Sequence, residues 1–294
     1  MTRATPPPLT PGSAIAPGYE VIEHLSRGKA LDVYDVWSEE RECRCVAKTL
    51  RPDRADDPKP RRRLEREGRL LRRLSHPHIV RGYEFLPTPR PLVIMETLTG
   101  ETLAHLIETS NERLRPLELA HLGLQLCSAI QYLHRHRFLH LDLKPSNIVA
   151  ETGRAKIIDL SVGRSPGRAG GGIGTWCYMA PEQVRGGELG PAADVWGIGV
   201  VLWEAATGRP AFGGDEDEAL LPSSSEEDLA EEHYPQLRCP AGPVRRHRRL
   251  PATLARAIDA TLVPDALDRP TTSALAALLE DVPGVVSPRS PRPS

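Results

Sequence analysis

The chain has 294 residues, a formal net charge of −1 and a hydrophobic fraction of 39%. This length allows a large core, and the near-zero charge excludes a general attraction to nucleic acid or to anionic membranes. The five cysteines are odd in number and lack paired metal-ligand spacing, so we expect free thiols. We recognise neither a signal peptide nor an apolar run of about 20 residues, and we therefore predict a cytoplasmic protein without a membrane segment.

Proline-rich segments mark both ends of the chain. TPPPLTPG lies within residues 1–18, and PGVVSPRSPRPS lies within residues 281–294. Proline at this density blocks regular structure, so we predict a disordered segment over 1–18 and a solvated tail over 281–294. The alternative for the tail is docking to a proline-reading or basic-motif partner.

Residues 19–98 are expected to form mostly strands and one helix. The helical stretch LEREGRLLRRL precedes HPHIV, and its leucines mark an apolar side. Glu67 lies between these leucines, and Glu65 is the alternative acidic residue. On the predicted strand that contains Cys43 and Cys45, we expect the two thiols to point to opposite faces.

Between His140 and Asn147 the chain reads HLDLKPSN, flanked by hydrophobic, strand-like runs. Phosphoryl transfer asks little covalent chemistry of a protein, so positioning and charge neutralisation supply most of the rate. Asp142 would orient an incoming hydroxyl and accept its proton, and Lys144 would neutralise charge on a γ-phosphate. Asn147 would reach a Mg²⁺ ion, which prefers oxygen ligands. The alternative is a polar surface loop.

A second acidic residue, Asp159, follows the β-branched run Ile157-Ile158. A buried strand that ends in an acid is a natural metal-binding position. Together with HLDLKPSN and with GTWCYMAPE at 174–182, this order of motifs resembles the eukaryotic-like, bacterial-type protein serine/threonine kinase family. The resemblance extends from about Tyr19 to about Leu279.

The resemblance implies an α+β, bilobal protein kinase fold. It places a small β-rich N-lobe with the αC helix over 19–98 and a larger, mainly α-helical C-lobe over 99–280. Within the C-lobe, DVWGIGVVLWEAATGRPAF resembles the buried αF helix. By the same resemblance, Asp194 would hold the catalytic-loop backbone, Thr175 would bond near Asp142 and Lys144, and Glu182 would pair with Arg269.

The resemblance also implies how ATP is held. Lys48 would bind the α- and β-phosphates, and Glu67, rather than Glu65, would pair with it. Lysine is rare in this arginine-rich chain, and a compact ammonium is not equivalent to a guanidinium at a phosphate site. Asn147 and Asp159 would ligate Mg²⁺, with Mn²⁺ as a possible substitute. The implied nucleotide-binding residues also include Leu25, Gly28, Val33, Ala47, Met95, Glu96, Leu98 and Val149.

Several residues depart from the family pattern. Ser26, Gly28 and Leu31 stand at the three places of the glycine-rich loop, so only the middle glycine is present. Glycine allows a backbone to approach phosphates closely, and its loss predicts weaker ATP binding or a more open loop. Leu141 replaces the arginine that receives an activation-loop phosphate, which argues against the usual phosphate-dependent switch. Ser161 replaces the last glycine of the metal-binding triplet.

Residues 213–250 read as a charged, insert-like segment, acidic first and then basic. The blocks could pair with each other, recruit a charged substrate, or form a solvated surface, which is the simplest interpretation. RRHRR lacks interleaved aromatic residues, so we predict no nucleic-acid binding.

These observations predict an ATP-dependent kinase that phosphorylates Ser or Thr of protein substrates. The candidate substrates include the protein itself, phosphorylated in a homodimer. The alternative is a pseudokinase that binds nucleotide or acts as a scaffold, which the eroded glycine loop and Ser161 favour. Retention of the two lysines and of the acidic and amide residues named above argues for the enzyme.

Overall fold

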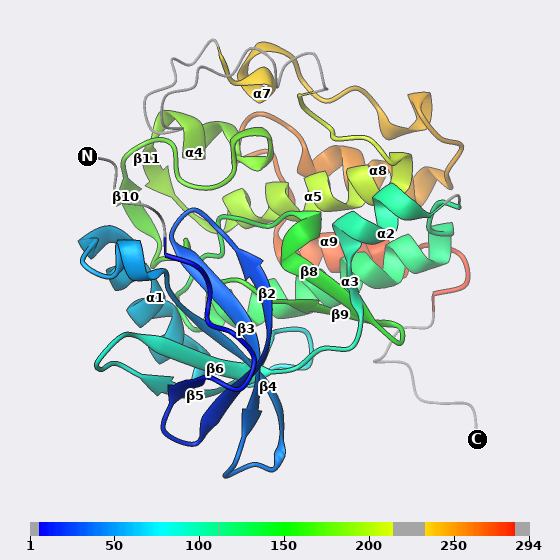
Figure 1. Cartoon of the computed structure of the whole chain (residues 1–294). Coiled ribbons are helices and arrows are strands. Elements are labelled where there is room, and N and C mark those ends of the chain that lie inside the picture. Colours follow the sequence, from blue (N-terminus) through cyan, green and yellow to red (C-terminus); the bar gives the residue numbers. More distant parts are fainter. Residues whose placement is uncertain (1–5, 111, 214–232, 286–294) are drawn as a thin grey trace. The chain divides into compact units, whose positions relative to one another are not determined.

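The structure is a computed structural model that describes residues 6–110, 112–213 and 233–285. The chain divides into two compact units, Met1–Thr99 and Gly100–Ser294 (Figure 1). Among the helices of the described residues, none has both the length and the apolar character needed to cross a bilayer.

The first unit is built on a six-stranded antiparallel sheet in the order β1-β2-β3-β4-β6-β5. Between β4 and β5 the chain forms a short 3₁₀ turn and one long helix, α1. The elements are β1 Ala14–Ala16, β2 Tyr19–Arg27, β3 Leu31–Ser38, β4 Cys43–Leu50, η1 Pro52–Arg54, α1 Pro58–Leu71, β5 Gly82–Leu86 and β6 Leu92–Glu96.

Register assigns residues of the sheet to two faces. Tyr34 pairs with Ala47 and Ala47 with Ile94, and all three belong to one hydrophobic cluster. Because successive side chains of a strand alternate, Lys48 points to the opposite face. The prediction for the two thiols was wrong: Cys43 packs against the cluster that contains Cys45, since residues two apart on a strand share a face.

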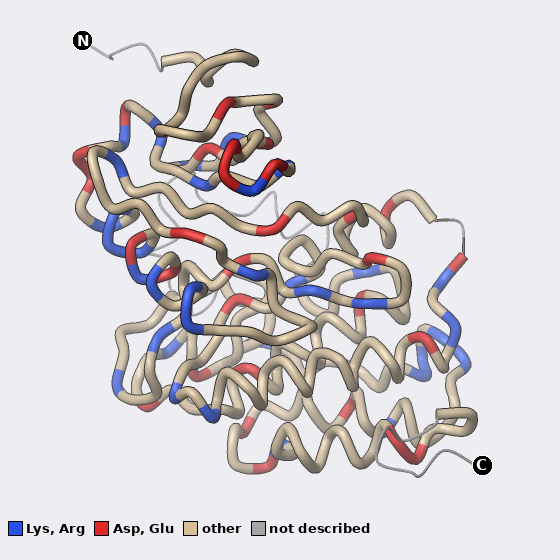
Figure 2. Tube along the Cα trace, turned by 90° about the horizontal axis from the view of Figure 1, so that it is seen from below, with Lys and Arg blue, Asp and Glu red and all other residues tan. Residues whose placement is uncertain are grey.

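Helix α1 begins with a capped first turn. The Asp57 side chain accepts a hydrogen bond of 3.1 Å from the Lys59 N–H, and Pro58 occupies the first helical position. Its buried side consists of Leu64, Glu67, Gly68 and Leu71. Its exposed positions include Arg62, Arg63, Arg66 and Arg69. Figure 2 colours lysine and arginine blue along the whole Cα trace.

The prediction that residues 1–18 are disordered was wrong for residues 6–18. The Gly12 N–H donates to the Val21 carbonyl at 2.8 Å, and the Val21 N–H donates to the Ser13 carbonyl at 2.9 Å. The next residues form β1, which pairs with β2. Proline content predicts the loss of regular helix or sheet. A segment that lacks regular helix or sheet is still ordered where its backbone groups find hydrogen-bond partners. Residues 1–5 lie outside the described residues.

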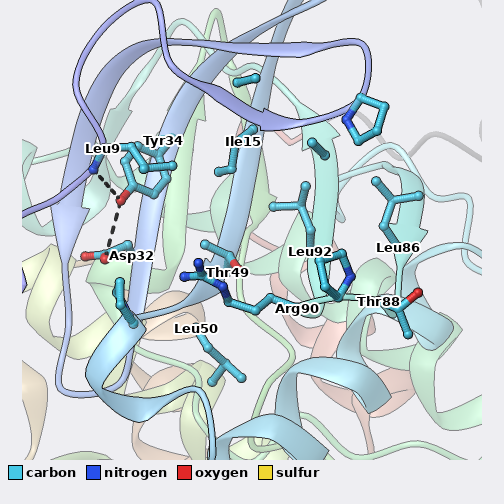
Figure 3. Close-up of a pocket in the computed structure, with 15 residues that line it drawn as sticks. Leu9, Ile15, Asp32, Tyr34, Thr49, Leu50, Leu86, Thr88, Arg90 and Leu92 are labelled. Carbon is cyan, nitrogen blue, oxygen red and sulfur yellow. Dashed lines mark hydrogen bonds between the residues drawn. The ribbon is translucent and has the colours of Figure 1, made fainter.

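The ordered segment borders a cavity of about 400 Å³ on the sheet face opposite Lys48 (Figure 3). Its walls are mostly apolar, with Asp32, Thr49, Thr88 and Arg90 as polar members. The cavity includes none of the predicted nucleotide-binding residues. The apolar lining residues include Leu9, Ile15, Leu50, Leu86 and Leu92.

The second unit is mainly helical, with two small sheets, β7-β8-β9 and β10-β11. Helix α5 is buried on nearly all sides because its residues are almost entirely apolar, as predicted for the αF helix. The elements are β7 Glu101–Thr102, α2 Leu103–Thr109, α3 Pro116–Arg135, η2 Pro145–Asn147, β8 Ile148–Glu151, β9 Arg154–Ile157, β10 Gly167–Ala169, η3 Trp176–Tyr178, α4 Pro181–Arg185, β11 Gly187–Leu189, α5 Pro191–Thr207, α7 Pro235–Arg238, η6 Val244–Arg246, α8 Ala252–Thr261 and α9 Thr272–Glu280.

The described part of the charged segment packs into the core of the second unit. Tyr234 and Gln236 are 3% and 2% exposed, and Val244 is fully buried, so residues 233–250 contribute to the core. Charge counts alone miss the apolar residues spaced among the arginines. Residues 214–232 lie outside the described part of the chain. Val282 is also buried, so packing continues past the boundary predicted at 280.

Candidate active site

In the first unit, Lys48 on β4 faces Glu67 on α1. The Lys48 Nζ lies 3.0 Å from Glu67 Oε1 and 2.9 Å from Oε2, and the Glu67 side chain is fully buried. Glu65, the alternative, instead bonds Arg61 and Arg69 on the surface of the helix at 3.1 Å each. Burial strengthens the interaction of Lys48 with Glu67 because water does not screen it.

Close packing holds α1 against the sheet at this position. Gly68 follows Glu67, and a Cβ at Gly68 would meet the Phe85 ring and lie 2.9 Å from Val93 Cγ2. The absence of a side chain therefore lets the helix approach the strands closely enough for the carboxylate to reach Lys48.

In the second unit, Asp194 of α5 fixes the backbone before the predicted catalytic residue. Its Oδ2 accepts from the His140 N–H at 2.9 Å, and its Oδ1 accepts from the Leu141 N–H at 2.7 Å. Leu141 has a φ of +63°, a strained conformation for a leucine, which these contacts hold in place. The prediction that Asp194 holds this backbone is confirmed.

His140 is a buried, neutral member of the same loop. Burial lowers its pKa, and its Nδ1 accepts a hydrogen bond of 3.2 Å from the Asp142 N–H. A ring nitrogen that accepts a hydrogen bond carries no proton, so geometry and pKa agree.

Three polar side chains converge at Asp142. Thr175 Oγ1 donates to Asp142 Oδ1 at 2.7 Å and accepts from Lys144 Nζ at 2.7 Å. Lys144 Nζ also lies 3.5 Å from Asp142 Oδ2. Asn147 Nδ2 donates to the Asp142 carbonyl at 2.9 Å and to Oδ2 at 3.2 Å. The predicted contacts of Thr175 are confirmed.

The oxygen donors predicted for a metal ion lie near this cluster. A backbone carbonyl can only accept, so the two bonds from Asn147 Nδ2 leave the Oδ1 of Asn147 turned away from Asp142. The Ile158 N–H donates to the Asn147 carbonyl at 3.0 Å, which places Asp159 one residue beyond that contact. A carboxylate and an amide oxygen are hard ligands of the kind that Mg²⁺ prefers.

A backbone hydrogen bond closes the triplet Asp159-Leu160-Ser161, which was predicted to bind a metal ion. Asp159 Oδ1 accepts from the Ser161 N–H at 2.8 Å, and Leu160 is 1% exposed in its apolar position. The serine therefore supports the carboxylate through its backbone.

One predicted nucleotide-binding residue is misplaced. Ala47 is fully buried in the hydrophobic cluster on the face opposite Lys48, so it cannot line a surface shared with that lysine. Val46 shares the Lys48 face and is partly exposed, and it pairs with Met95 on β6. Parity along the strand, counted back two residues from Lys48, is the signal that identifies Val46.

The other predicted nucleotide-binding residues of the first unit lie on strands or at their ends. Leu25 on β2 is 49% exposed, whereas Met95 is 5% exposed. Val33 pairs with Lys48 and shares its face, and Glu96 ends β6 with Leu98 two residues further. In the second unit, Val149 lies on β8 and is 7% exposed.

The segment Ser26–Leu31 at the place of the glycine-rich loop contains no residue with a positive φ. The side chains at the two substituted glycine positions therefore occupy ordinary backbone conformations. Their presence does not strain the loop.

Two further contacts hold the segment from 174 to 182. Arg269 is fully buried, and its guanidinium bonds Glu182 Oε1 at 2.7 Å and Oε2 at 2.9 Å, which confirms the predicted pair. Sequence reasoning missed Gln183, whose Nε2 donates to the carbonyls of Leu141 at 2.8 Å and Ile173 at 2.6 Å. Its position directly after Ala-Pro-Glu is the only sequence signal.

Comparison with known proteins assigns this arrangement to a family. The protein kinase domain profile matches residues 19–279. The chain belongs to the protein kinase family. Its α+β kinase fold and its likeness to bacterial serine/threonine kinases, both predicted from sequence, are confirmed.

Two curated kinases illustrate the similarity. A probable serine/threonine-protein kinase of Streptomyces coelicolor is 32% identical over 69% of the chain and 32% of its own length. Serine/threonine-protein kinase PknB of Mycobacterium tuberculosis is 29% identical over 90% of the chain and 43% of its own length. This kinase chain thus spans less than half the length of these relatives.

A solved structure agrees at the level of the fold. The kinase domain of PknI from Mycobacterium tuberculosis superposes with a TM-score of 0.69 at 21% identity. The match covers 93% of this kinase chain and 98% of that domain.

Proposed function

We propose that this kinase transfers the γ-phosphate of ATP to Ser or Thr hydroxyls of protein substrates. The observation that carries the proposal is the cluster of Thr175, Lys144 and Asn147 around the Asp142 carboxylate. The buried pair of Lys48 and Glu67 in the first unit supports it independently. The pseudokinase alternative gains no support from the comparisons.

Asp142 acts as the base and orienting group. Its carboxylate is held from several sides, so it accepts the substrate hydroxyl proton without first rearranging. Lys144 stabilises charge on the transferred phosphoryl group. Thr175 bonds both Asp142 and Lys144 and so fixes the positions of their side chains. Lys48, oriented by Glu67, binds the α- and β-phosphates.

The hard oxygen donors Asn147 and Asp159 fit a divalent cation, and we propose Mg²⁺ as its identity, with Mn²⁺ as a substitute. When bound, this ion neutralises the phosphate oxygens. We propose protein substrates and a cytoplasmic location; autophosphorylation in a homodimer stays a prediction.

The proposal predicts that Asp142→Asn abolishes phosphotransfer while nucleotide binding persists. Loss of the base lowers kcat by orders of magnitude, because the amide cannot accept the proton. Transfer of labelled γ-phosphate from Mg-ATP to the protein and to a generic basic substrate, followed by phosphoamino-acid analysis, measures this.

Asp56→Asn, the same change at an exposed residue, is the control and should keep full activity. Label on Ser or Thr that persists in Asp142→Asn would refute the role of Asp142. A wild type that is inactive with both Mg²⁺ and Mn²⁺ would refute the proposed activity.

A further inference from the structure

The loop that replaces the glycine-rich loop forms a tight hairpin tip. The Gly28 N–H donates to the Leu31 carbonyl at 2.8 Å, with Lys29 and Ala30 between them. At its base, Arg27 pairs with Asp32 across the two strands. The tip is therefore closed by backbone contacts of its own.

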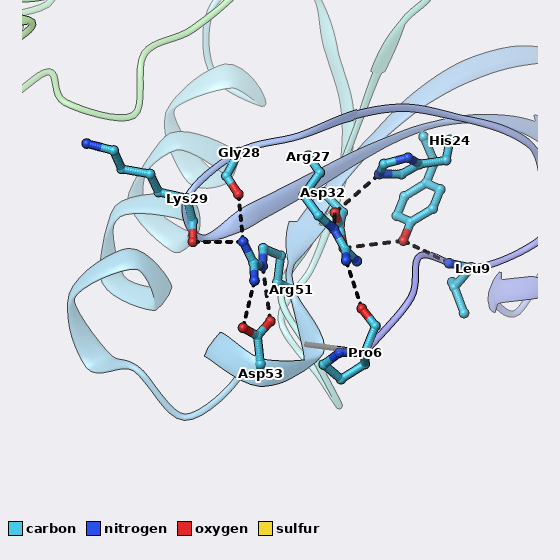
Figure 4. A network of polar contacts seen from close by, with 10 residues as sticks. Pro6, Leu9, His24, Arg27, Gly28, Lys29, Asp32, Arg51 and Asp53 are labelled. Atoms are coloured by element: carbon cyan, nitrogen blue, oxygen red, sulfur yellow. Dashed lines mark hydrogen bonds and ion pairs between the residues drawn. The ribbon is translucent and has the colours of Figure 1, made fainter. Parts of the chain in front are cut away.

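A partly buried ion pair fixes the base of this hairpin (Figure 4). Arg27 Nε lies 2.7 Å from Asp32 Oδ1, and Nη2 lies 2.9 Å from Oδ2. The Asp32 side chain is 1% exposed. Burial alone would raise its pKa, but hydrogen bonds from Arg27 and His24 outweigh burial and lower it, so the carboxylate is ionised at neutral pH.

A second arginine holds the tip itself. Arg51 makes a two-point pair with Asp53, with contacts of 3.0 and 2.7 Å. Its Nη1 donates to the carbonyls of Gly28 at 3.1 Å and Lys29 at 3.3 Å, and its backbone N–H donates to the Ala30 carbonyl at 2.9 Å. One residue thus binds three successive carbonyls of the tip.

The amino-terminal segment joins the same network. Arg27 Nη1 donates to the Pro6 carbonyl at 2.7 Å, and the Leu9 N–H donates to Tyr34 Oη at 3.1 Å. Tyr34 Oη in turn donates to Asp32 Oδ2 at 3.4 Å. Residues 6–9 therefore contact Arg27 directly and are linked to the Asp32 carboxylate through the Tyr34 hydroxyl (Figure 4).

We propose that Arg27, Asp32 and Arg51 are positioning residues of the nucleotide site, which hold the hairpin tip in one shape ready to receive phosphates. Glycine loops adapt to phosphates at an entropic cost. Here the backbone of the tip has ordinary φ angles, and Arg27 and Arg51 hold it through their hydrogen bonds. Such a preformed tip binds phosphates without the entropic cost of being ordered first. Residues 6–9 fix the orientation of the Arg27 side chain.

This inference rests on the proposed function, which supplies the nucleotide. It predicts that Arg27→Gln and Arg51→Gln each raise the dissociation constant for Mg-ADP and the KM for ATP about tenfold. The kcat should stay within about threefold, because the Asp142 cluster is untouched. Hydrogen exchange of amides 26–31 should accelerate in both variants.

Arg41→Gln is the matched control. Arg41 has 25% side-chain exposure against 23% for Arg27 and bonds Tyr19 at 2.8 Å, away from the loop. It should change neither nucleotide affinity nor loop exchange. Deletion of residues 1–9 should act as Arg27→Gln does, but more weakly.

A double-mutant cycle separates positioning from misfolding. Arg27→Gln, Asp32→Asn and their combination should show coupled, not additive, losses of nucleotide affinity, measured at a temperature where melting curves show each variant folded. Additive losses would overturn the inference. So would unchanged exchange at 26–31, or faster exchange with unchanged affinity.

The outcome is separable from that of the proposed function. If nucleotide binding depends on Arg27 but the wild type transfers no phosphate, the inference stands and the kinase activity falls. If the wild type is an active kinase and Arg27→Gln binds nucleotide normally, the inference alone falls. A wild type that binds no nucleotide overturns both.

Discussion

At the scale of single residues, Gly68 determines how closely α1 approaches the sheet. A methyl group there would meet the Phe85 ring and lie 2.9 Å from Val93 Cγ2. Alanine favours a helix over glycine by about 1 kcal/mol, but overpacking a core costs about 1–3 kcal/mol. We expect Gly68→Ala to lower the melting temperature and to reduce phosphotransfer, because the shift would separate Glu67 from Lys48.

Two variants test that explanation. Gly242→Ala, where the nearest atom to the new Cβ is Arg246 Nη1 at 3.9 Å, should leave both quantities nearly unchanged. Phe85→Leu should partly rescue Gly68→Ala by making room for the methyl. A Gly68→Ala protein that is more stable than the wild type would show that helix propensity outweighs the contact.

At the scale of the element, α1 carries repeated positive charge on its outer side. Arg62, Arg66 and Arg69 follow one another at helical spacing, and Glu65 bonds Arg69 at 3.1 Å. Arg62→Glu would place a carboxylate four residues before Arg66, the favourable order. We expect a gain of about 0.2–0.5 kcal/mol in the free energy of unfolding.

Salt dependence distinguishes this effect from a change in helix propensity. The gain, measured by urea unfolding, should shrink between low salt and 1 M NaCl, where the Debye length is about 3 Å. Arg62→Gln, which removes the charge without adding a partner, should gain less. An equal gain at both salt concentrations would contradict the electrostatic explanation.

Elements also show what the sequence could predict. The octapeptide HLDLKPSN is contiguous, so the proposed chemistry could be predicted from its residues, and α1 could be predicted from its leucines. Ala47 was misassigned because motif spacing ignores which face a strand residue takes. The order of residues 6–18 depends on groups elsewhere in the chain that bond its backbone, such as the Tyr34 hydroxyl, which accepts from the Leu9 N–H. Proline content carries no signal of these groups.

At the scale of the whole molecule, two compact units raise the question of how their stabilities are linked. The pair of Glu182 and Arg269 lies entirely in the second unit, where the Arg269 side chain is buried and fully hydrogen-bonded. All five N–H donors of Arg269 have acceptors, namely the two Glu182 oxygens and the carbonyls of Ala192, Val263 and Pro264. No donor is left to exchange for water.

We expect Arg269→Gln to cost the second unit about 3–5 kcal/mol, because it leaves the Glu182 carboxylate without its partner. Native-state hydrogen exchange should then show lost protection at amides of residues 100–285, with those of residues 6–99 unchanged. Arg154→Gln, at an exposed position of β9, is the control and should alter neither region. Equal loss of protection in both units would mean instead that the chain unfolds as one cooperative body. Each change in the free energy of unfolding predicted above would then apply to the whole chain and not to one unit.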